Sequence, residues 1–557
     1  MNKNVWTPAP TINSDQELWD ILSHNRPRIT NANNPPQFTG EWWNLFTNPF
    51  ELDGMQTACE RIFTAIKNQE RIIVFGDFDS DGITSTVILT KAIAELGGLV
   101  SYRIPDRTND NHGLKNYLFD EIASKQVSLV ITCDCGINDN NEVAYAQSVG
   151  IDTIVTDHHT PKKESFPKAA VAVINPKLNP DYSEQEFSGS AVALKLVQAL
   201  AETKYSTKRE AAEFWKKFIE ISAIGVVADC VELVGENRLI TQLGLQNMNQ
   251  SEWSGLKALL DTQTNAGEMN EETIGFFIAP HLNAASRIGD RLIAAQLFLG
   301  NPNNTQNIIR HLQELNQARK ELTQNGLQES RLQIDKSQKC QILYADHWLP
   351  GILGLIASRI SEQTGTPTIA CTKKSDGSIG ASCRSVPGVS IIKALHEPTV
   401  VQYLTFYGGH SGAAGFVCEE SNFEALKTAL QNYFNQCEFP PKTHQVEAWL
   451  PYELITETLI TKIKTLAPFG EGNPNPILGV KNVFITEQKS LGQSNEHFQL
   501  NGLVNGTPIR FVSFFTPPHL KNIKLNTKYD ILFYADTQYW QGQPQIKLQL
   551  VDAKSSN

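Results

Sequence analysis

The sequence contains few cysteines, no long apolar run and no excess of positive charge. Its 557 residues include nine cysteines, an odd number spread thinly along the chain, which excludes a disulfide framework and favours a reducing compartment. The most apolar stretch, residues 221–234, contains Asp229 and Glu232 and is too short to span a bilayer. No apolar segment follows Met1 to Asn4, so secretion is not indicated. We therefore expect a cytoplasmic protein with no membrane association.

The overall charge is acidic, with 48 Lys and Arg against 59 Asp and Glu, a net charge of −11. This balance argues against a protein that coats nucleic acid indiscriminately. The acid is uneven, however, because residues 442–557 hold 11 Lys and Arg but only 9 Asp and Glu. A nucleic-acid substrate therefore stays compatible with the composition, provided that the basic track is local.

The length predicts about three or four domains. Strand-like and helical segments alternate between residues 51 and 240, which predicts an α/β domain with a doubly wound parallel sheet. Residues 1–50 mix Asn, Pro and aromatic residues, and we expect this N-terminal arm to pack on the first domain. Residues 241–336 are expected to be a helical connector. From about residue 290 its apolar residues recur at helical spacing, which predicts a long helix with one apolar stripe.

The second half of the chain contains two more predicted domains. Residues 337–439 form a second α/β segment with a strand at 341–344 and glycine-rich turns, and Pro440-Pro441 marks a boundary. Residues 442–557 contain five strand-like segments, which predict a small OB-like β-barrel. The five segments are 477–486, 497–504, 508–515, 529–535 and 545–551.

Acids and histidines cluster where apolar runs end. The clustered residues are Asp77, Asp79 and Asp81 after residues 72–75, Asp134 after 129–131, Asp157, His158 and His159 after 154–155, and Asp229 after 221–228. Ligands of open α/β sheets bind at the carboxyl ends of the strands. Six carboxylates and two imidazoles in one crevice would repel strongly unless cations neutralised them. The pattern predicts a multinuclear metal site, and two-metal hydrolysis is its default chemistry.

Calcium and zinc suit these residues less well. Asp-x-Asp-x-Asp-Gly also opens a calcium-binding EF-hand loop, but that loop needs Glu at its twelfth position, which here is Ile88, and a helix before it. Structural zinc needs four sulfur or nitrogen ligands, whereas carboxylates dominate this set despite the neighbouring Cys133, Cys135 and Cys230. Oxygen-rich ligation with an imidazole favours manganese or magnesium, and manganese above magnesium.

The order of these acidic motifs resembles that of the DHH phosphoesterase superfamily. The downstream motifs resemble those of the RecJ family of single-strand-specific exonucleases, from about residue 50 to the C-terminus. They are Leu-Asn-Ala-Ala-Ser-Arg at 282–287, Gly-Ala-Ser-Cys-Arg-Ser at 380–385, Gly-Gly-His-Ser-Gly-Ala-Ala-Gly at 408–415 and Pro-Phe-Gly-Glu-Gly-Asn-Pro at 468–474. One departure is Leu349, where family members usually carry His; it affects a substrate contact rather than a metal ligand.

The resemblance implies roles for the acidic cluster. Two manganese or magnesium ions would be held by Asp79, Asp81, Asp134, His158 and Asp229, with Asp134 as the bridging carboxylate. Asp77 would be a further ligand, or would instead hold the turn and a water. His159 would contact the non-bridging oxygen at which charge develops, or alternatively support the ligands from behind.

The resemblance also implies phosphate binding by the second half of the chain. The residues concerned are Arg287, Ser382, Arg384, Ser385, Gly408, Gly409 and His410. The alternative is that these segments are tight turns and that Arg384 forms a surface ion pair. Aromatic residues of the barrel could stack bases, although core packing is the alternative for each: Phe498, Phe511, Phe514, Phe515 and Tyr539. Because the barrel holds none of the acids above, we expect it to be a strand-binding tether outside the active site.

The resemblance implies 5′→3′ degradation of single-stranded DNA to mononucleotides in DNA repair and recombination. A monomer is expected, with a helicase and a single-strand-binding protein as partners. Two rival functions stay open. One is a DHH phosphodiesterase for short oligonucleotides or cyclic dinucleotides, which the barrel and the long helix disfavour. The other is an inactive single-strand-binding replication scaffold, which the retained acids disfavour.

Overall fold

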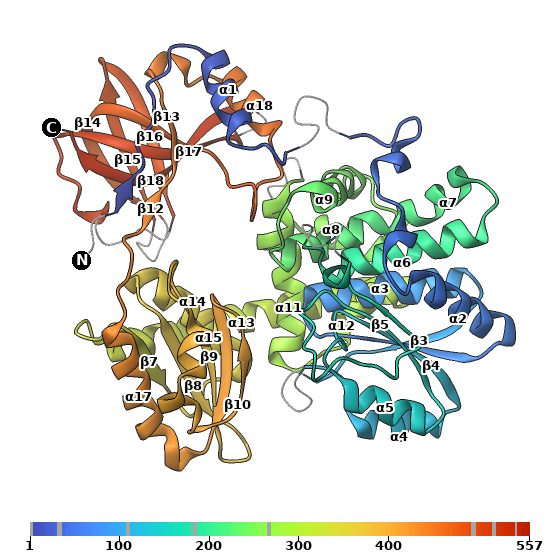
Figure 1. The fold of residues 1–557 in the computed structure, drawn as a ribbon. Helices are drawn as coiled ribbons and strands as arrows, with labels where there is room; N and C mark the ends of the chain where they lie inside the picture. The colour runs from blue at the N-terminus through green and yellow to red at the C-terminus, as the bar shows by residue number, and fades with distance from the viewer. Residues whose placement is uncertain are drawn as a thin grey trace.

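The computed structural model describes residues 4–29, 36–106, 112–179, 182, 186–263, 269–491, 497–514, 520–540 and 543–556, with backbone alone at 538–540, 543 and 544. Three lobes are visible in Figure 1: a first domain, a second domain joined to it by helix α13, and a C-terminal barrel domain. None of the helices in these ranges has the length and apolar character needed to cross a membrane.

The first domain is built on a five-stranded sheet in the order β3-β2-β4-β5-β6, in which every neighbouring pair is parallel. The strands are β2 (Arg71–Gly76), β3 (Leu99–Arg103), β4 (Val127–Cys133), β5 (Asp152–Thr156) and β6 (Ala172–Ile174). Successive side chains of a strand point to opposite faces, so Ile72 and Val74 join one apolar core and Ile73 and Phe75 join another. The predicted doubly wound sheet is confirmed.

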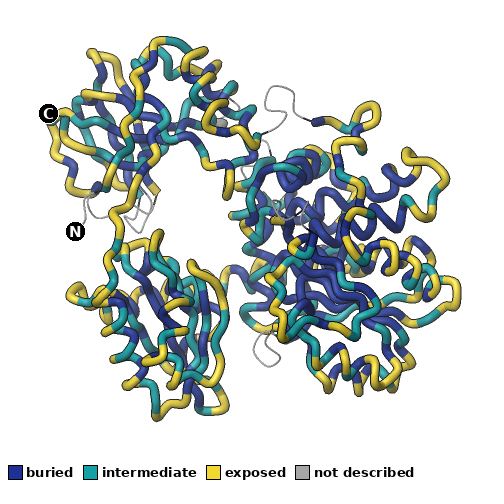
Figure 2. Tube along the Cα trace, in the orientation of Figure 1, coloured by how far each residue is buried: buried dark blue, intermediate teal, exposed yellow. Residues whose placement is uncertain are grey.

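Helices cover both faces of this sheet, and Figure 2 shows its strands as a buried layer. One core contains residues of α2 (Met55–Asn68), α3 (Ser80–Glu95), α6 (Gly189–Lys204), α7 (Lys208–Trp215) and α8 (Ile219–Ala228). The other contains residues of α4 (Asn116–Ala123) and α5 (Asn140–Ser148). Helix α3 is buried on nearly every side, and it begins within the first acidic cluster.

The N-terminal arm divides between two domains. Strand β1 (Val5–Trp6) pairs in parallel with β12 (Thr443–His444), and α1 (Asp15–His24) packs Leu18 and Leu22 into the barrel core. The expectation that the arm packs on the first domain is therefore wrong for residues 4–29. It holds further along, where Trp42 is buried in the first domain with its ring centroid 4.7 Å from that of Trp215. Composition alone did not show which of two apolar surfaces the arm covers.

The connector is helical, as predicted. Its elements are α9 (Gly235–Met248), α10 (Ser254–Leu260), the π-helix η6 (Thr273–Ile278), α11 (Ala279–Ile288), α12 (Ile293–Leu299) and α13 (Thr305–Gln333). The long helix α13 starts later than residue 290, because Gly300 to Asn304 interrupt the α-helical structure before it. Its Ile308 and Leu312 are buried in the first domain and its Leu327 in the second, so one helix spans both domains.

The second domain contains a mixed sheet in the order β10-β11-β9-β8-β7, with only β7 and β8 parallel. Its strands are β7 (Gln341–Tyr344), β8 (Thr368–Lys373), β9 (Ile379–Arg384), β10 (Leu404–Gly409) and β11 (Ala413–Cys418). Helix α14 (Pro350–Thr364) packs on one face, and α15 (Ile391–His396), α16 (Pro398–Val401) and α17 (Phe423–Gln436) pack in the core of the other.

The barrel domain closes on itself, because β14 pairs with both β15 and β17 in the circuit β14-β15-β16-β18-β17. These strands are β14 (Ile477–Leu491), β15 (His497–Val504), β16 (Thr507–Ser513), β17 (Lys528–Trp540) and β18 (Gln543–Ser555). All five predicted strands are confirmed, although Phe515, the predicted end of one, lies outside the described residues. Strand β13 (Val446–Trp449) and helix α18 (Glu457–Lys464) add to them.

Candidate metal centre

The structure brings the predicted acids and His158 together at the carboxyl edge of the first sheet. Asp77 follows β2, Asp134 follows β4 and His158 follows β5, whereas Asp229 follows a helix, α8. The Nε2 atom of His158 lies 3.0 Å from Asp134 Oδ1, 3.7 Å from Asp229 Oδ2 and 4.0 Å from Asp81 Oδ2. One imidazole thus faces three carboxylates.

The ligand atoms fall into overlapping groups, each with its atoms within 4.8 Å of one another. The groups are Asp77, Asp79 and Asp134; Asp81, His158 and Asp229; and Asp134, Asp157, His158 and His159. Asp134 belongs to the first and third groups, and its Oδ1 lies beside the imidazole of the second. This geometry offers two neighbouring positions for cations, with Asp134 between them.

Backbone amides hold two of the carboxylates. Asp81 accepts hydrogen bonds from the Gly189 and Ser190 amides at 2.6 and 2.9 Å, at the start of α6, where the helix dipole favours a negative charge. Asp79 caps α3, and its Oδ1 accepts from the Asp81 and Gly82 amides at 3.0 and 3.1 Å. One oxygen of Asp79 is thereby used in capping the helix.

Two glycines let the carboxylates approach the helices closely. A Cβ at Gly189 would lie 2.6 Å from Asp134 Cβ, and a Cβ at Gly225 in α8 would lie 2.4 Å from Asp81 Oδ1. Neither position accommodates a side chain, because both contacts are far inside van der Waals distance.

Crowding of the acids perturbs their ionisation. Burial, followed by the charges of Asp81 and Asp79, raises the pKa of Asp134 well above its usual range. Burial and the charge of Asp81 likewise raise the pKa of Asp229 to about 9. Burial lowers the pKa of His158, which keeps the imidazole neutral and its lone pair free to bind a cation. Cations would relieve the repulsion among the ionised acids.

Three buried atoms of the cluster test whether metals fit. Asp77 Oδ1, Asp134 Oδ1 and His158 Nε2 have no hydrogen-bond partner within the described part of the chain. Asp134 Oδ1 and His158 Nε2 are 3.0 Å apart without hydrogen-bond geometry, as expected for two atoms that share a cation. Leaving buried polar atoms unpaired costs about 1–3 kcal/mol each. A carboxylate-rich donor set with one imidazole suits Mn²⁺ or Mg²⁺.

Asp157 orients the second histidine. Its Oδ2 accepts from the Ile137 amide at 3.0 Å, and its Oδ1 accepts from the amides of His158 and His159 and lies 2.8 Å from His159 Nδ1. With both oxygens engaged, Asp157 is a poor metal ligand despite its place in one group. Burial lowers the pKa of His159, but the charge and hydrogen bond of Asp157 outweigh it and raise that pKa to about 9. His159 is therefore a charged donor beside the cluster.

Two further residues reach the site that the sequence did not single out. His112 Nδ1 lies 3.0 Å from Asp77 Oδ2, and the Asn283 side-chain oxygen accepts from the Ser80 amide at 2.9 Å. Asn283 lies within the motif at 282–287, so the motif was visible but the contact with the acidic turn was not. His112 has no periodic or motif signal of its own.

The predicted phosphate-binding residues gather at one end of the second sheet and beside it. Ser382 of β9 pairs with Gly415 of β11, which pairs with Gly408 of β10. Arg384 ends β9 and Gly409 ends β10, next to His410, which is exposed. The Ser385 hydroxyl donates to the Val389 carbonyl at 2.6 Å, so it also serves a tight turn.

Arg287 and Arg384 both lie against the first turns of α14. Arg287 Nη1 donates to the Gly351 carbonyl at 2.8 Å, and a Cβ at Gly354 would lie 2.9 Å from Arg384 Nη2. Helix α11, which carries Arg287, also carries the Asn283 that contacts the acidic turn. Arg287 is thus tied to both domains, whereas Arg384 contacts α14 from within the second domain. Leu349, the departure from the family motif, caps α14 and is 39% exposed.

The aromatic candidates of the barrel have different surroundings. Phe498 and Phe511 are buried in the barrel core, so they are packing residues. Phe514 is 44% exposed, with Lys547 Nζ 5.2 Å from its ring centroid and the His497 ring edge-on at 5.6 Å, so it is an exposed aromatic candidate that already has two partners. Phe515 and the side chain of Tyr539 lie outside the described residues.

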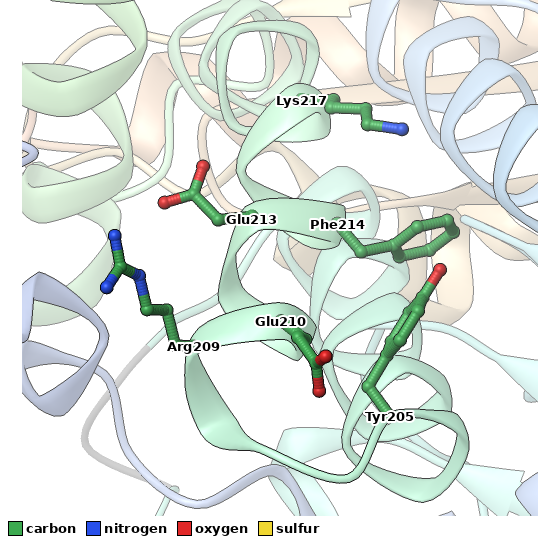
Figure 3. A pocket seen from close by; sticks show the side chains of 6 residues that line it. All are labelled: Tyr205, Arg209, Glu210, Glu213, Phe214 and Lys217. Carbon is green, nitrogen blue, oxygen red and sulfur yellow. The ribbon is translucent and has the colours of Figure 1, made fainter.

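A pocket of about 400 Å³ is lined by residues of α7 and of the segments that flank it. Figure 3 shows the six side chains that line it, from Tyr205 to Lys217. None of them belongs to the acidic cluster or to the phosphate-binding set.

Comparisons with known proteins match the three domains. Family models match at residues 71–226 (DHH family, N-terminal domain), 337–436 (DHHA1 domain) and 446–552 (RecJ OB domain). The single-stranded-DNA-specific exonuclease RecJ of Bacillus subtilis is 30% identical over 92% of this chain and 64% of that protein. RecJ of Haemophilus influenzae is 30% identical over 81% of this chain and 82% of its own length.

A solved structure of a RecJ protein has the same overall fold. The crystal structure of RecJ in complex with Mn²⁺ from Thermus thermophilus covers 100% of this chain and is itself covered to 80%, with a TM-score of 0.83 and 27% identity. The chain spans about two thirds or less of the length of the first curated relatives, namely 64% of the Bacillus subtilis protein and 61% of the Thermus thermophilus one.

Proposed function

Because this chain belongs to the RecJ family, as its motifs predicted, we propose that it is a metal-dependent exonuclease that degrades single-stranded DNA in the 5′→3′ direction. The observation that carries the proposal is the unpartnered pair Asp134 Oδ1 and His158 Nε2, 3.0 Å apart within a ring of acids. Such a pair suits shared ligation of one divalent cation.

The first-domain residues would hold two Mn²⁺ or Mg²⁺ ions. Asp77, Asp79 and Asp134 would hold one ion, and Asp81, His158 and Asp229 would hold the other, with Asp134 contributing to both. When bound, two such cations polarise a phosphodiester and make the attacking water more acidic. Asp79 and Asp81 are oriented by backbone amides, so their geometry is set before substrate arrives.

His159 would donate a hydrogen bond to the non-bridging oxygen of the scissile phosphate. Asp157 holds its Nδ1 side, so its Nε2 side is the one available to substrate. The side chain is 56% exposed, which makes it accessible to a strand that enters the cluster.

The second domain would bind the phosphate at the strand end. Arg287 and Arg384 lie beside the first turns of α14, where a helix N-terminus also favours an anion. Ser382, Gly408, Gly409 and His410 would contribute further donors. Capture of a terminal phosphate at a set place relative to the cations is what would make cleavage exonucleolytic, one nucleotide at a time.

The biological setting is part of the proposal. Membership of the family supports a role in repair and recombination in the cytoplasm, as a monomer acting with a helicase and a single-strand-binding protein. The closed barrel, with Phe514 and Lys547 on its surface, supports long single strands as substrate rather than cyclic dinucleotides.

A digest in Mn²⁺ of one oligonucleotide, labelled at either the 5′ or the 3′ end, tests the proposal. We expect the 5′ label to appear at once as a mononucleotide and the 3′-labelled strand to shorten gradually. The matching duplex should resist digestion. Release of mononucleotides from the 3′ end, or equal digestion of the duplex, would contradict it. Asp134→Ala protein serves as the control for contaminating nucleases.

A further inference from the structure

A loop of the barrel domain contacts the chain segment that carries Asp229. This barrel loop comprises residues 465–474. The Leu233 amide donates to the Glu471 carbonyl at 2.8 Å, and the Phe469 amide donates to Glu271 Oε1 at 2.8 Å. Leu233 is only four residues beyond Asp229. The barrel domain therefore reaches the edge of the metal centre.

Arg238 of α9 fastens the loop to the first domain. Its side chain is 1% exposed, and its Nη1 donates to the Leu466 carbonyl at 2.8 Å while its Nη2 donates to the Thr465 carbonyl at 3.4 Å. Gln242, one turn later, donates to the Ala467 carbonyl at 3.2 Å. A buried guanidinium needs such acceptors, because an unpaired buried charge is strongly unfavourable.

The barrel loop is itself held in one shape. Asn473 is completely buried, and its Nδ2 donates to the carbonyls of Leu466 and Pro468, both at 2.8 Å. Gly472 has a φ of +72° and sits so close that a Cβ there would lie 2.9 Å from Glu232 Cβ. The loop therefore fits closely against residues 230–234, the turn between α8 and α9.

That turn determines where Asp229 lies. Asp229 caps the end of α8, Cys230 takes a left-handed φ of +59°, and Asn237 donates to the Glu232 carbonyl at 3.0 Å. The Asp229 side chain is 25% exposed, against 1% for Asp81, which two backbone amides also hold. Asp229 is the less enclosed carboxylate, so its position follows from the backbone of the turn.

We propose that the barrel loop is a positioning element for Asp229: through Arg238 and Asn473 it holds the turn at 230–234 so that the carboxylate faces Asp81 and His158. This inference rests on the two-cation centre of the proposed function. Arg238 and Asn473 are positioning residues and touch neither cation nor substrate. On this inference the barrel, expected from the sequence to be a strand-binding tether outside the active site, would also help to complete the second cation position.

The test is a Mn²⁺ binding titration in the absence of substrate. The electron paramagnetic resonance signal of free Mn²⁺ measures how much of the ion is bound. The proteins are the full chain, Asn473→Ala, Gln242→Ala, Arg238→Met and Arg238→Lys. We expect Asn473→Ala and Arg238→Met to weaken one of two Mn²⁺ sites by about 10- to 100-fold, as for residues that orient metal ligands, and to spare the other. Gln242→Ala should have a smaller effect, and Arg238→Lys should recover part of the affinity.

Two comparisons separate positioning from general destabilisation. Tyr452→Phe removes a hydrogen bond to the Pro508 carbonyl elsewhere in the barrel domain and should leave Mn²⁺ binding unchanged. Adding Asn473→Ala to Asp229→Asn should have no further effect on Mn²⁺ binding, because both act on the same ligand. If Arg238→Met fails to fold, Asn473→Ala and Gln242→Ala carry the comparison.

Unchanged Mn²⁺ binding in folded Asn473→Ala, equal weakening of both sites, or an additive loss in the double variant would overturn the inference. These outcomes are distinct from failure of the proposed function. A wild-type chain that binds two Mn²⁺ ions but cuts no single-stranded DNA refutes the nuclease and leaves the positioning role standing. A wild-type chain that binds no Mn²⁺ overturns both.

Discussion

His159 Nδ1 lies 2.8 Å from Oδ1 of Asp157, the carboxylate that directly follows strand β5. Burial raises the pKa of Asp157, but the charge and hydrogen bond of His159 outweigh it and lower that pKa to about 2. The same contact raises the pKa of His159 to about 9, after the opposing effect of burial. Asp157 therefore stabilises the fold at pH values above the pKa that it has in the unfolded chain. His159 stabilises the fold at pH values below the pKa that it has in the unfolded chain. Both contributions are fully present only between about pH 4 and 6.5.

Replacing His159 with Ala should lower kcat while leaving Mn²⁺ binding unchanged. The loss of one donor to a developing charge is expected to cost about 10²–10³-fold in rate. Asp157→Asn should cause a smaller loss, because the imidazole stays but its orientation weakens. Single-turnover rates at saturating Mn²⁺ provide the measurement. A His159→Ala protein with normal kcat and weakened Mn²⁺ binding would show that His159 supports the ligands instead.

Replacing Asp134 with Ala should eliminate cleavage in a chain that still folds and binds single strands. The carboxylate would lie between the two proposed cation positions, so its removal should affect both together, whereas strand binding should rest on phosphate contacts elsewhere. Turnover in Mn²⁺ and fluorescence anisotropy with a labelled strand should be measured on the same preparation. Turnover above a few per cent of wild type would refute the assignment.

The metal-free chain should lose stability as pH rises. Burial and neighbouring acids raise the pKa of Asp229 from 3.8 to about 9, so between those values the folded state holds a proton that the unfolded state has released. Thermal unfolding in chelator should therefore show Tm falling from about pH 4 to pH 9. Mn²⁺ should flatten this slope, and Asp229→Asn should reduce it without metal. A Tm that rises across this range would contradict the reasoning.

Arg287→Ala and Arg384→Ala should weaken use of the substrate without removing the cations. Loss of a charge-assisted contact to phosphate is expected to cost about 1.5–3 kcal/mol in kcat/KM. Arg384→Lys keeps the charge but loses the fork, so it should recover only part of the loss. Strands with a 5′-phosphate and a 5′-hydroxyl should be compared. If the arginines bind the terminal phosphate, their replacement will matter mainly for the phosphorylated strand.

A chain ending near residue 440 should be impaired on short and long substrates alike. Truncation removes the carbonyl acceptors of buried Arg238 and the contact from Glu471 to Leu233. We expect a lower Tm for the first domain and weaker Mn²⁺ binding. Rates on three-nucleotide and fifty-nucleotide strands, at the same fraction folded, provide the measurement. A loss of cleavage rate on the fifty-nucleotide strand alone would show that the barrel acts as a separate tether.

Much of this fold could be predicted because it depends on local patterns of apolar and polar residues along the chain. Runs such as Ile72 to Phe75 are apolar at every position, which is typical of a strand buried on both faces, and the acids that follow them had to meet at one sheet edge. The five barrel strands were also visible in the sequence. Asp229 was found as the end of an apolar stretch, although that stretch is a helix rather than a strand.

The sequence by itself determined the order of the domains, the type of the first sheet and the identity of the clustered acids, because these depend on residue type and spacing along the chain. Only the tertiary structure decided that residues 4–29 lie on the barrel, that His112 contacts Asp77, and that Arg238 is buried beneath the barrel loop. Those contacts join residues that are 35 to 548 positions apart or lie in different domains. No periodicity records such pairings, since they depend on which surfaces meet when the packed elements assemble.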